Sequence, residues 1–167
     1  DFEKAKWFNH KYLQLKSKEE LSEKYICLVK VKGVETSPTF AEKIVELVKE
    51  RANFIEDLWE ASLFFFYRPE NYDESIIKKR WKEDTPAHLT AIATLIQSIQ
   101  PFNPVQAHDA TMNYILEKEL NTGQIMNCLR LCLVGYAKGP DLFTIIELLG
   151  VPETVERIYL AINKIKL

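Results

Sequence analysis

The sequence lacks most of the features that mark membrane-spanning and catalytic chains. It contains no run of about 18 apolar residues of the kind that crosses a bilayer. It has no glycine-rich phosphate loop, no Gly-x-Ser-x-Gly turn and no His-Glu-x-x-His helix. Its three histidines lie far apart in sequence, and none is paired with a nucleophile. We therefore expect no catalytic residue in this chain and no contact with a membrane.

Cysteine is scarce, and its spacing is uninformative for disulfides. The chain has three cysteines and no Cys-x-x-Cys pair, which favours the reduced thiols of a cytoplasmic protein. Cys128 and Cys132 share one helix face and could begin a metal site, but no third ligand lies near them in sequence. We interpret both as core residues and expect no metal. The start at Asp1, without a secretion-type leader, predicts a trimmed cytoplasmic fragment.

The chain also has no excess of positive charge, since its formal net charge is −2. Proteins that bind nucleic acid usually carry a basic footprint, so the overall charge does not indicate such a function. The basic residues gather locally instead, in two groups: Lys78, Lys79, Arg80 and Lys82, and then Arg157, Lys164 and Lys166. Solvated helix faces are the favoured interpretation of both groups, and a binding surface is the alternative.

What the sequence does have is helical periodicity and frequent helix start signals. With 167 residues, of which 47% are hydrophobic, it is long enough to bury a core. Apolar residues recur at helical spacing from Phe40 through Arg51 to Ile55, and again from Leu89 to Ile99, which predicts two amphipathic helices. Start signals that join a capping residue to Glu or Pro are Ser17 with Glu20, Ser37-Pro38, Thr85-Pro86 and Asn103-Pro104.

Strand signals are thin. Only Tyr25–Val31 is β-prone, and because it has no turn partner we favour a helix that ends near Gly33. The aromatic run Phe64–Tyr67 is interpreted as core between helices rather than as a stacking platform. The prediction is an all-α chain of two packed helical subdomains, residues 1–100 and 101–167, divided at Pro101–Pro104.

Two arginines and one turn are candidates for a binding site. Arg130 lies among leucines in an apolar helix, so its guanidinium must reach solvent or find acceptors. Gly139-Pro140 has the pattern of a helix start with Pro in the first turn, and a bare glycine there would let a base approach the backbone. The neighbours of Arg51 at three and four residues along a helix are all apolar, so no acid at those positions could pair with it. A structural ion pair is the ordinary role of either arginine in isolation, and recognition of single-stranded RNA bases is the alternative.

Four segments, taken in order, resemble bacterial-type glutamyl-tRNA synthetases of class I. Lys6–Leu13 resembles the Trp-x-Asn-x-x-Tyr segment where that family passes from its catalytic half into its helical tRNA-binding half. The segments that resemble the anticodon-reading tip of the family are Leu129–Gly135, Gly139–Phe143 and Leu148–Gly150. The resemblance runs over essentially the whole chain. It implies the C-terminal anticodon-binding helical bundle, without the catalytic half.

The resemblance also implies roles for the candidate residues. Arg130, Gly139, Pro140 and Leu142 would hold the first two anticodon bases, and Arg51 would contact the third, which separates glutamate tRNA from glutamine tRNA. The implied partner is tRNA(Glu), bound by a monomer. ATP and Mg²⁺ would belong to the absent catalytic half, so we expect this chain to bind no cofactor and to be inactive by itself. The alternative is a helical protein–protein interaction module without RNA binding, in which both arginines form structural ion pairs.

Overall fold

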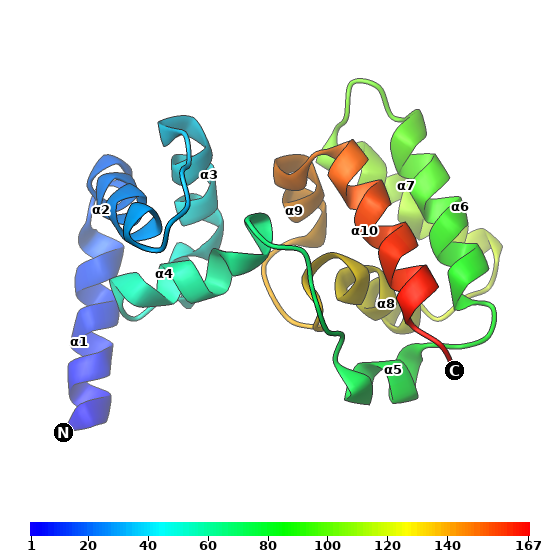
Figure 1. Cartoon of the computed structure of the whole chain (residues 1–167), viewed down its shortest axis with the longest axis horizontal. Helices are drawn as coiled ribbons and strands as arrows, with labels where there is room; N and C mark the ends of the chain where they lie inside the picture. Colours follow the sequence, from blue (N-terminus) through cyan, green and yellow to red (C-terminus); the bar gives the residue numbers. More distant parts are fainter. The chain divides into compact units, whose positions relative to one another are not determined.

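The computed structural model describes all residues from Asp1 to Leu167, and all of its regular elements are helices, so the all-α prediction is confirmed. The chain divides into two compact units, Asp1–Tyr67 and Arg68–Leu167. The helices of the first unit, blue to teal in Figure 1, are α1 (Phe2–Leu15), α2 (Lys18–Val31), α3 (Pro38–Val48), the 3₁₀ turn η1 (Lys49–Arg51), α4 (Ile55–Ser62) and the 3₁₀ turn η2 (Leu63–Phe65). Those of the second, green to red, are α5 (Glu74–Arg80), α6 (Thr85–Ser98), α7 (Pro104–Glu117), α8 (Thr122–Val134), α9 (Leu142–Leu149) and α10 (Val151–Lys164).

Three of the four predicted helix starts are confirmed by side-chain caps. The side chains of Ser17, Ser37 and Asn103 each accept a hydrogen bond from the backbone N–H three residues further on. The fourth prediction is wrong by one residue, because Asp84 is the N-cap of α6 and Thr85 is already helical. The Thr85 hydroxyl instead accepts from the N–H of Lys82 at 2.9 Å.

The long helix predicted from Phe40 to Ile55 is wrong, because it breaks in the middle. Helix α3 ends at Val48, the chain tightens into the 3₁₀ turn η1, and Ala52 is extended. The Asp57 carboxylate then accepts the N–H groups of Asn53 and Phe54, at 2.8 and 2.9 Å, which starts α4 as a separate helix. Arg51 therefore lies at the end of a tight turn.

The first unit is built around the packing of α2 against α3 and α4. The β-prone stretch Tyr25–Val31 is helical as predicted, and Gly33 follows the helix end with φ of +83°. Tyr25 is fully buried and its hydroxyl lies 2.6 Å from that of Ser62 on α4. Its apolar setting raises the pKa of this phenol to about 12. These contacts fix α2 on α4 within the unit.

The aromatic run has the core role predicted for its first half only. Phe64 and Phe65 are buried, at 6% and 8% exposure, whereas Tyr67 is 51% exposed. Phe66 stacks on Trp59, with the ring centroids 5.8 Å apart. The run thus begins in the core of the first unit and ends at its surface.

The second unit is centred on α10, which packs against α6, α8 and α9 (Figure 1). Helices α6 and α7, which flank the turn Pro101–Pro104, also pack against each other. The boundary expected at this turn therefore lies inside the second compact unit, because the turn joins two packed helices. In neither unit is a helix both long and apolar enough to span a membrane.

Candidate nucleic-acid interface

Arg130 and the loop that follows α8 form one local structure. Arg130 Nη1 donates a hydrogen bond of 2.7 Å to the carbonyl oxygen of Pro140. A Cβ atom at Gly139 would lie 3.1 Å from the same nitrogen, and Gly139 has φ of +149°. The glycine thus allows both the backbone conformation and the close approach of the guanidinium. The sequence-predicted residues Arg130, Gly139 and Pro140 are brought together.

The start of α9 differs from the expectation of a Gly-Pro helix start. Pro140 is buried and precedes the cap, so it is not in the first turn. Asp141 is the N-cap, and its carboxylate accepts the N–H and the hydroxyl of Thr144, each at 2.8 Å. The Leu142 side chain is only 2% exposed, so its packing in the core anchors α9 beneath the loop. Any contact from Leu142 to a ligand would have to come from its backbone.

Tyr136 belongs to this loop although the sequence analysis did not single it out. Its side chain is 40% exposed. Burial of its hydroxyl raises the pKa of the phenol, and the nearby charge of Arg130 acts against that rise. Its position directly after Gly135, the left-handed residue that ends α8, is the sequence signal that could have identified it. An aromatic ring beside a guanidinium is a suitable surface for a base.

The same loop is fastened to the N-terminal segment of the second unit. The N–H of Asp73 donates to the carbonyl oxygen of Gly135 at 2.9 Å. A Cβ at Gly135 would approach the Asn71 carbonyl oxygen to 2.9 Å, closer than real Cβ atoms come. With φ of +88°, this position also requires glycine for its backbone. The loop between α8 and α9 therefore starts from a fixed point.

Arg157 corrects the expectation of a solvated basic group, because it is only 3% exposed. Its Nη1 donates to the carbonyl oxygen of Leu133 at 2.7 Å, near the end of α8, where helix carbonyls lack intrahelical partners. Its Nε donates to the Glu153 carboxylate at 2.9 Å, and Arg68 donates two further bonds of 2.9 Å to that group. Hydrogen bonds from Arg68, and then from Arg157, hold the pKa of Glu153 down to about 2.

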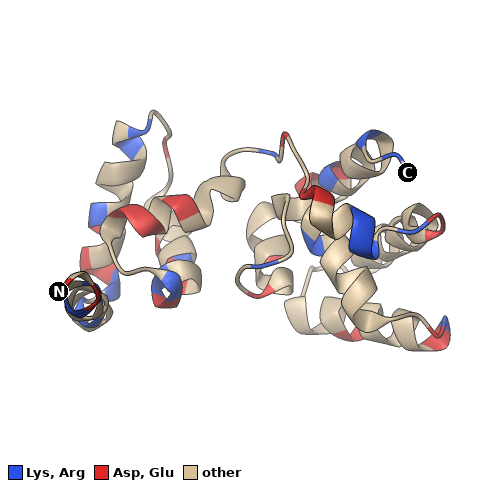
Figure 2. Ribbon diagram, turned by 90° about the horizontal axis from the view of Figure 1, so that it is seen from below, with Lys and Arg blue, Asp and Glu red and all other residues tan.

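The remaining members of the two basic groups are exposed, as the solvated-face interpretation expects, except that Arg80 is half-buried. Figure 2 shows the basic residues of α5 as one blue block at the end of that helix. The buried Gln124 side chain donates to the Arg80 carbonyl oxygen at 2.8 Å, which fixes this end of α5 against α8.

Arg51 lies in the first unit and its side chain is exposed. Helix α1 holds the backbone on both sides of it. The His10 ring donates to the carbonyl oxygen of Ala52 at 2.8 Å, and the Gln14 amide donates to that of Lys49 at 2.9 Å. The turn that contains Arg51 is thus fixed to α1, the helix that includes the family-like segment Lys6–Leu13.

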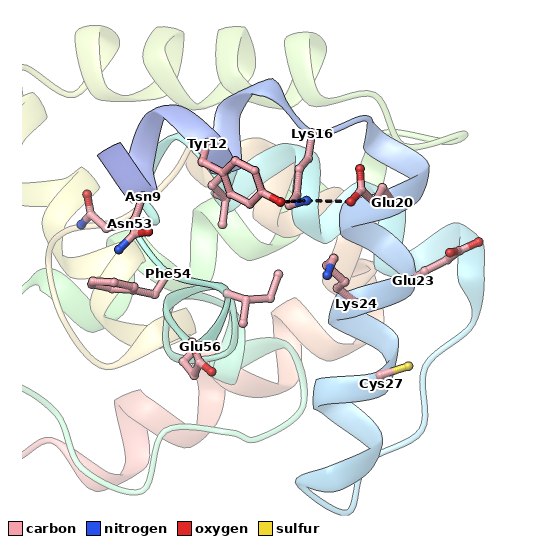
Figure 3. Close-up of a pocket in the computed structure, with 12 residues that line it drawn as sticks. Asn9, Tyr12, Lys16, Glu20, Glu23, Lys24, Cys27, Asn53, Phe54 and Glu56 are labelled. Carbon is pink, nitrogen blue, oxygen red and sulfur yellow. Dashed lines mark hydrogen bonds and ion pairs between the residues drawn. The ribbon is translucent and has the colours of Figure 1, made fainter. Parts of the chain in front are cut away.

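A hollow of about 720 Å³ lies between α1, α2 and the start of α4 in the first unit. Figure 3 shows Tyr12, Lys16 and Glu20 in a row on its wall. Lys16 Nζ lies 2.6 Å from the Glu20 carboxylate and 3.0 Å from the Tyr12 hydroxyl. Hydrogen bonds to Glu20 and Tyr12 raise the pKa of Lys16. The charges that line this wall are thus engaged with each other.

Cys128 and Cys132 are both fully buried, which confirms their interpretation as core residues. Burial raises the pKa of the Cys128 thiol to about 11 and that of Cys132 further. Thiols in such a setting are protonated and unreactive at neutral pH.

Comparison with known proteins shows the family of the chain. Residues 5–162 match the family described as the anticodon binding domain. The chain belongs to the anticodon binding domain family. Among curated relatives, this anticodon binding domain is 42% identical over 166 residues to a glutamate–tRNA ligase of Phocaeicola vulgatus, covering 99% of the chain and 33% of the relative. It is 44% identical over 163 residues to that of Porphyromonas gingivalis, covering 98% of the chain and 32% of the relative.

Solved structures give the same result for the fold. A glutamate–tRNA ligase from Elizabethkingia meningosepticum superposes with a TM-score of 0.93 at 38% identity, over 98% of this anticodon binding domain and 32% of that chain. The enzyme from Elizabethkingia anophelis gives a TM-score of 0.89 at 36% identity, with the same coverage. The chain thus spans about a third of the length of the relatives it matches. The family resemblance stated from the sequence is confirmed.

Proposed function

We propose that this anticodon binding domain recognises the anticodon of tRNA(Glu) as part of a glutamate–tRNA ligase. The support comes from family membership and from the names of the relatives, which are glutamate–tRNA ligases. Family membership does not favour the alternative of a protein-interaction module without RNA binding.

The arrangement of Arg130 is the observation that carries the proposal. A guanidinium held by one nitrogen on the Pro140 carbonyl keeps its plane in a fixed orientation. Such a plane, next to a bare glycine backbone, can hydrogen-bond or stack with an unstacked base. In this mechanism Arg130, Gly139, Pro140 and the backbone at Leu142 bind the first two anticodon bases.

Arg51 is proposed to contact the third anticodon base. Its exposed side chain can reach a ligand, while hydrogen bonds from α1 fix the backbone on either side of it. A guanidinium that donates two hydrogen bonds to a base edge gives about 1–3 kcal/mol of discrimination. This contact would separate glutamate tRNA from glutamine tRNA.

The parent enzyme is proposed to attach glutamate to tRNA(Glu) with ATP in the cytoplasm, as a monomer. The domain would contribute binding energy far from the reacting groups, and this energy orients the acceptor end of the tRNA. ATP and Mg²⁺ would act in the part of the relatives that this chain does not match. This domain would then bind tRNA and perform no chemistry itself.

Filter binding of glutamate and glutamine tRNA transcripts to the chain, at low and moderate salt, tests the proposal. We expect the chain to prefer glutamate tRNA, and we expect Arg130→Ala to weaken its binding by roughly ten-fold or more. Lys118→Gln, at the exposed C-cap of α7 in the same unit, is the matched control. Equal binding of the two tRNAs, together with no effect of Arg130→Ala, would contradict the proposal.

A further inference from the structure

A second hollow lies in the Arg68–Leu167 unit, between α5 and the end of α10. Its volume is about 760 Å³. Lysines from both basic groups of the sequence line it, Lys78 from the first and Lys164 with Lys166 from the second. Residues almost ninety positions apart therefore contribute positive charge to one concave surface, which a solvated helix face does not require.

The charge balance of this hollow is positive, in contrast to the chain as a whole. Among its lining residues the only acidic side chain is Glu74, whose carboxylate lies 4.0 Å from Lys78 Nζ. Both side chains of that pair are at least 80% exposed, so water and salt screen the attraction between them. Lys78 thus remains available to a stronger anion.

The floor of the hollow is aromatic and apolar. Lys164 Nζ lies 6.0 Å from the centre of the Tyr72 ring and donates to the backbone carbonyl of Glu70. Ile77 and Ile165 line the hollow beside it. An ion pair made over such a floor is less screened than one in open water. The fixed position of Lys164 gives the surface a defined cationic centre.

We propose that this lysine-lined hollow, whose lining includes none of Arg130, Gly139 and Pro140, binds a backbone phosphate of the RNA. The inference rests on the proposed function, which supplies RNA as the ligand. Phosphate contacts from lysine position a nucleic acid and carry no sequence information. The hollow would therefore add affinity for any tRNA, while Arg130 and Arg51 supply the discrimination.

The test is the salt dependence of tRNA binding by Lys78→Gln/Lys166→Gln. Lys164 is left in place because it also bonds to the Glu70 carbonyl. The control is Lys43→Gln/Lys118→Gln, which removes the same charge from two exposed lysines outside the hollow. We measure binding of glutamate and glutamine tRNA transcripts between about 50 and 200 mM salt. Circular dichroism melting confirms that each variant is folded.

For the hollow variant we expect the slope of log K against log salt to become shallower by about 1–2. At low salt both tRNAs should bind roughly three- to ten-fold more weakly. The control should keep the parent slope. Equal slopes for the two variants would overturn the inference while leaving anticodon recognition intact. The parent chain could instead show no preference between the two tRNAs while the hollow variant still has a shallower slope of log K against log salt. That result would contradict the proposed function and support the phosphate site.

Discussion

Arg130 is held by its guanidinium, whereas Arg51 extends from a segment whose backbone is held. In the first case Nη1 is bonded to the Pro140 carbonyl, and α8 is tied at its end to the buried Arg157. In the second, His10 and Gln14 fix the turn and leave the side chain exposed. Replacing Arg130 should therefore disturb its own loop, whereas replacing the exposed Arg51 should affect recognition more than stability.

The largest effect is expected from Arg157→Leu, because it removes the support beneath the Arg130 loop. The change leaves the Leu133 carbonyl without its donor and takes one of two cations from Glu153. We expect unfolding of the second unit to become easier by about 2–4 kcal/mol, measured by urea titration with circular dichroism.

Arg68→Leu is the matched control for Arg157→Leu, since Arg68 binds the same carboxylate from an exposed position. Its loss should cost less than about 1 kcal/mol. Equal costs for the two variants would show that the burial of Arg157 adds nothing to the stability of the second unit.

The next largest effect is expected from acid, which should lower the stability of the second unit by protonating Glu153. The pKa of Glu153 is lowered in the folded chain, from 4.5 to about 2. Because a lowered pKa favours the folded state once the carboxyl is ionised, its contribution is complete above about pH 4.5. It is lost as pH falls towards 2. The measurement is urea unfolding of the parent and Glu153→Gln at several pH values.

The gap in stability between the parent and Glu153→Gln should narrow as pH falls through this range, since both then carry a neutral group at position 153. Other carboxylates titrate in both proteins and cancel in the difference. A gap that is constant from pH 6 to pH 2 would refute the role of the ionised carboxylate.

Gly139→Ala should have an intermediate effect, confined to the Arg130 loop. Alanine at φ of +149° is strained, and its Cβ would lie 3.1 Å from Arg130 Nη1. We expect a cost of about 1–3 kcal/mol and weaker tRNA binding, measured by thermal melting and filter binding.

Gly123→Ala provides the control for Gly139→Ala. Gly123 is helical, and a Cβ there would meet only an ordinary contact at 3.5 Å. Alanine at this position should be neutral or slightly stabilising. If Gly139→Ala also proves neutral in both assays, the close approach of Arg130 to the loop is not needed.

The smallest effect on stability is expected from Arg51→Gln. Because the side chain is exposed, the free energy of unfolding should change by less than about 0.5 kcal/mol. Discrimination between C and G at the third anticodon base should nevertheless fall, which binding assays with paired transcripts measure. A drop in melting temperature of many degrees would instead make Arg51 a structural ion-pair residue.

Local signals in the sequence were sufficient for the helices and most of their ends. Ser17, Ser37 and Asn103 cap the helices that their side chains predict, and Gly135 and Gly150 end α8 and α9. The break after Val48 escaped prediction because the apolar spacing continues through it. The break is decided by two hydrogen bonds that the Asp57 carboxylate accepts from the N–H groups of Asn53 and Phe54. The apolar periodicity carries no signal for these bonds.

The candidate site was less predictable than the helices. The sequence identified Arg130 with Gly139 and Pro140, because the arginine and the turn are close in the chain. It missed the burial of Arg157, since a basic residue near other basic residues has the pattern of a solvated face. It also treated Leu142 as a contact residue, although the start of α9 buries this side chain.

Caps, apolar spacing and ordered motifs act over short stretches, so they are enough to predict the helical class, the family and the arginines that are candidates for base recognition. The packing of the helices determines which cations are buried, which line the same surface and which support a loop. Arg157 reaches the Leu133 carbonyl, and Arg68 reaches Glu153, only once distant segments have packed. Lys78 and Lys164 line one hollow for the same reason. These outcomes depend on the desolvation of charge and on contacts between distant segments, which no local pattern specifies.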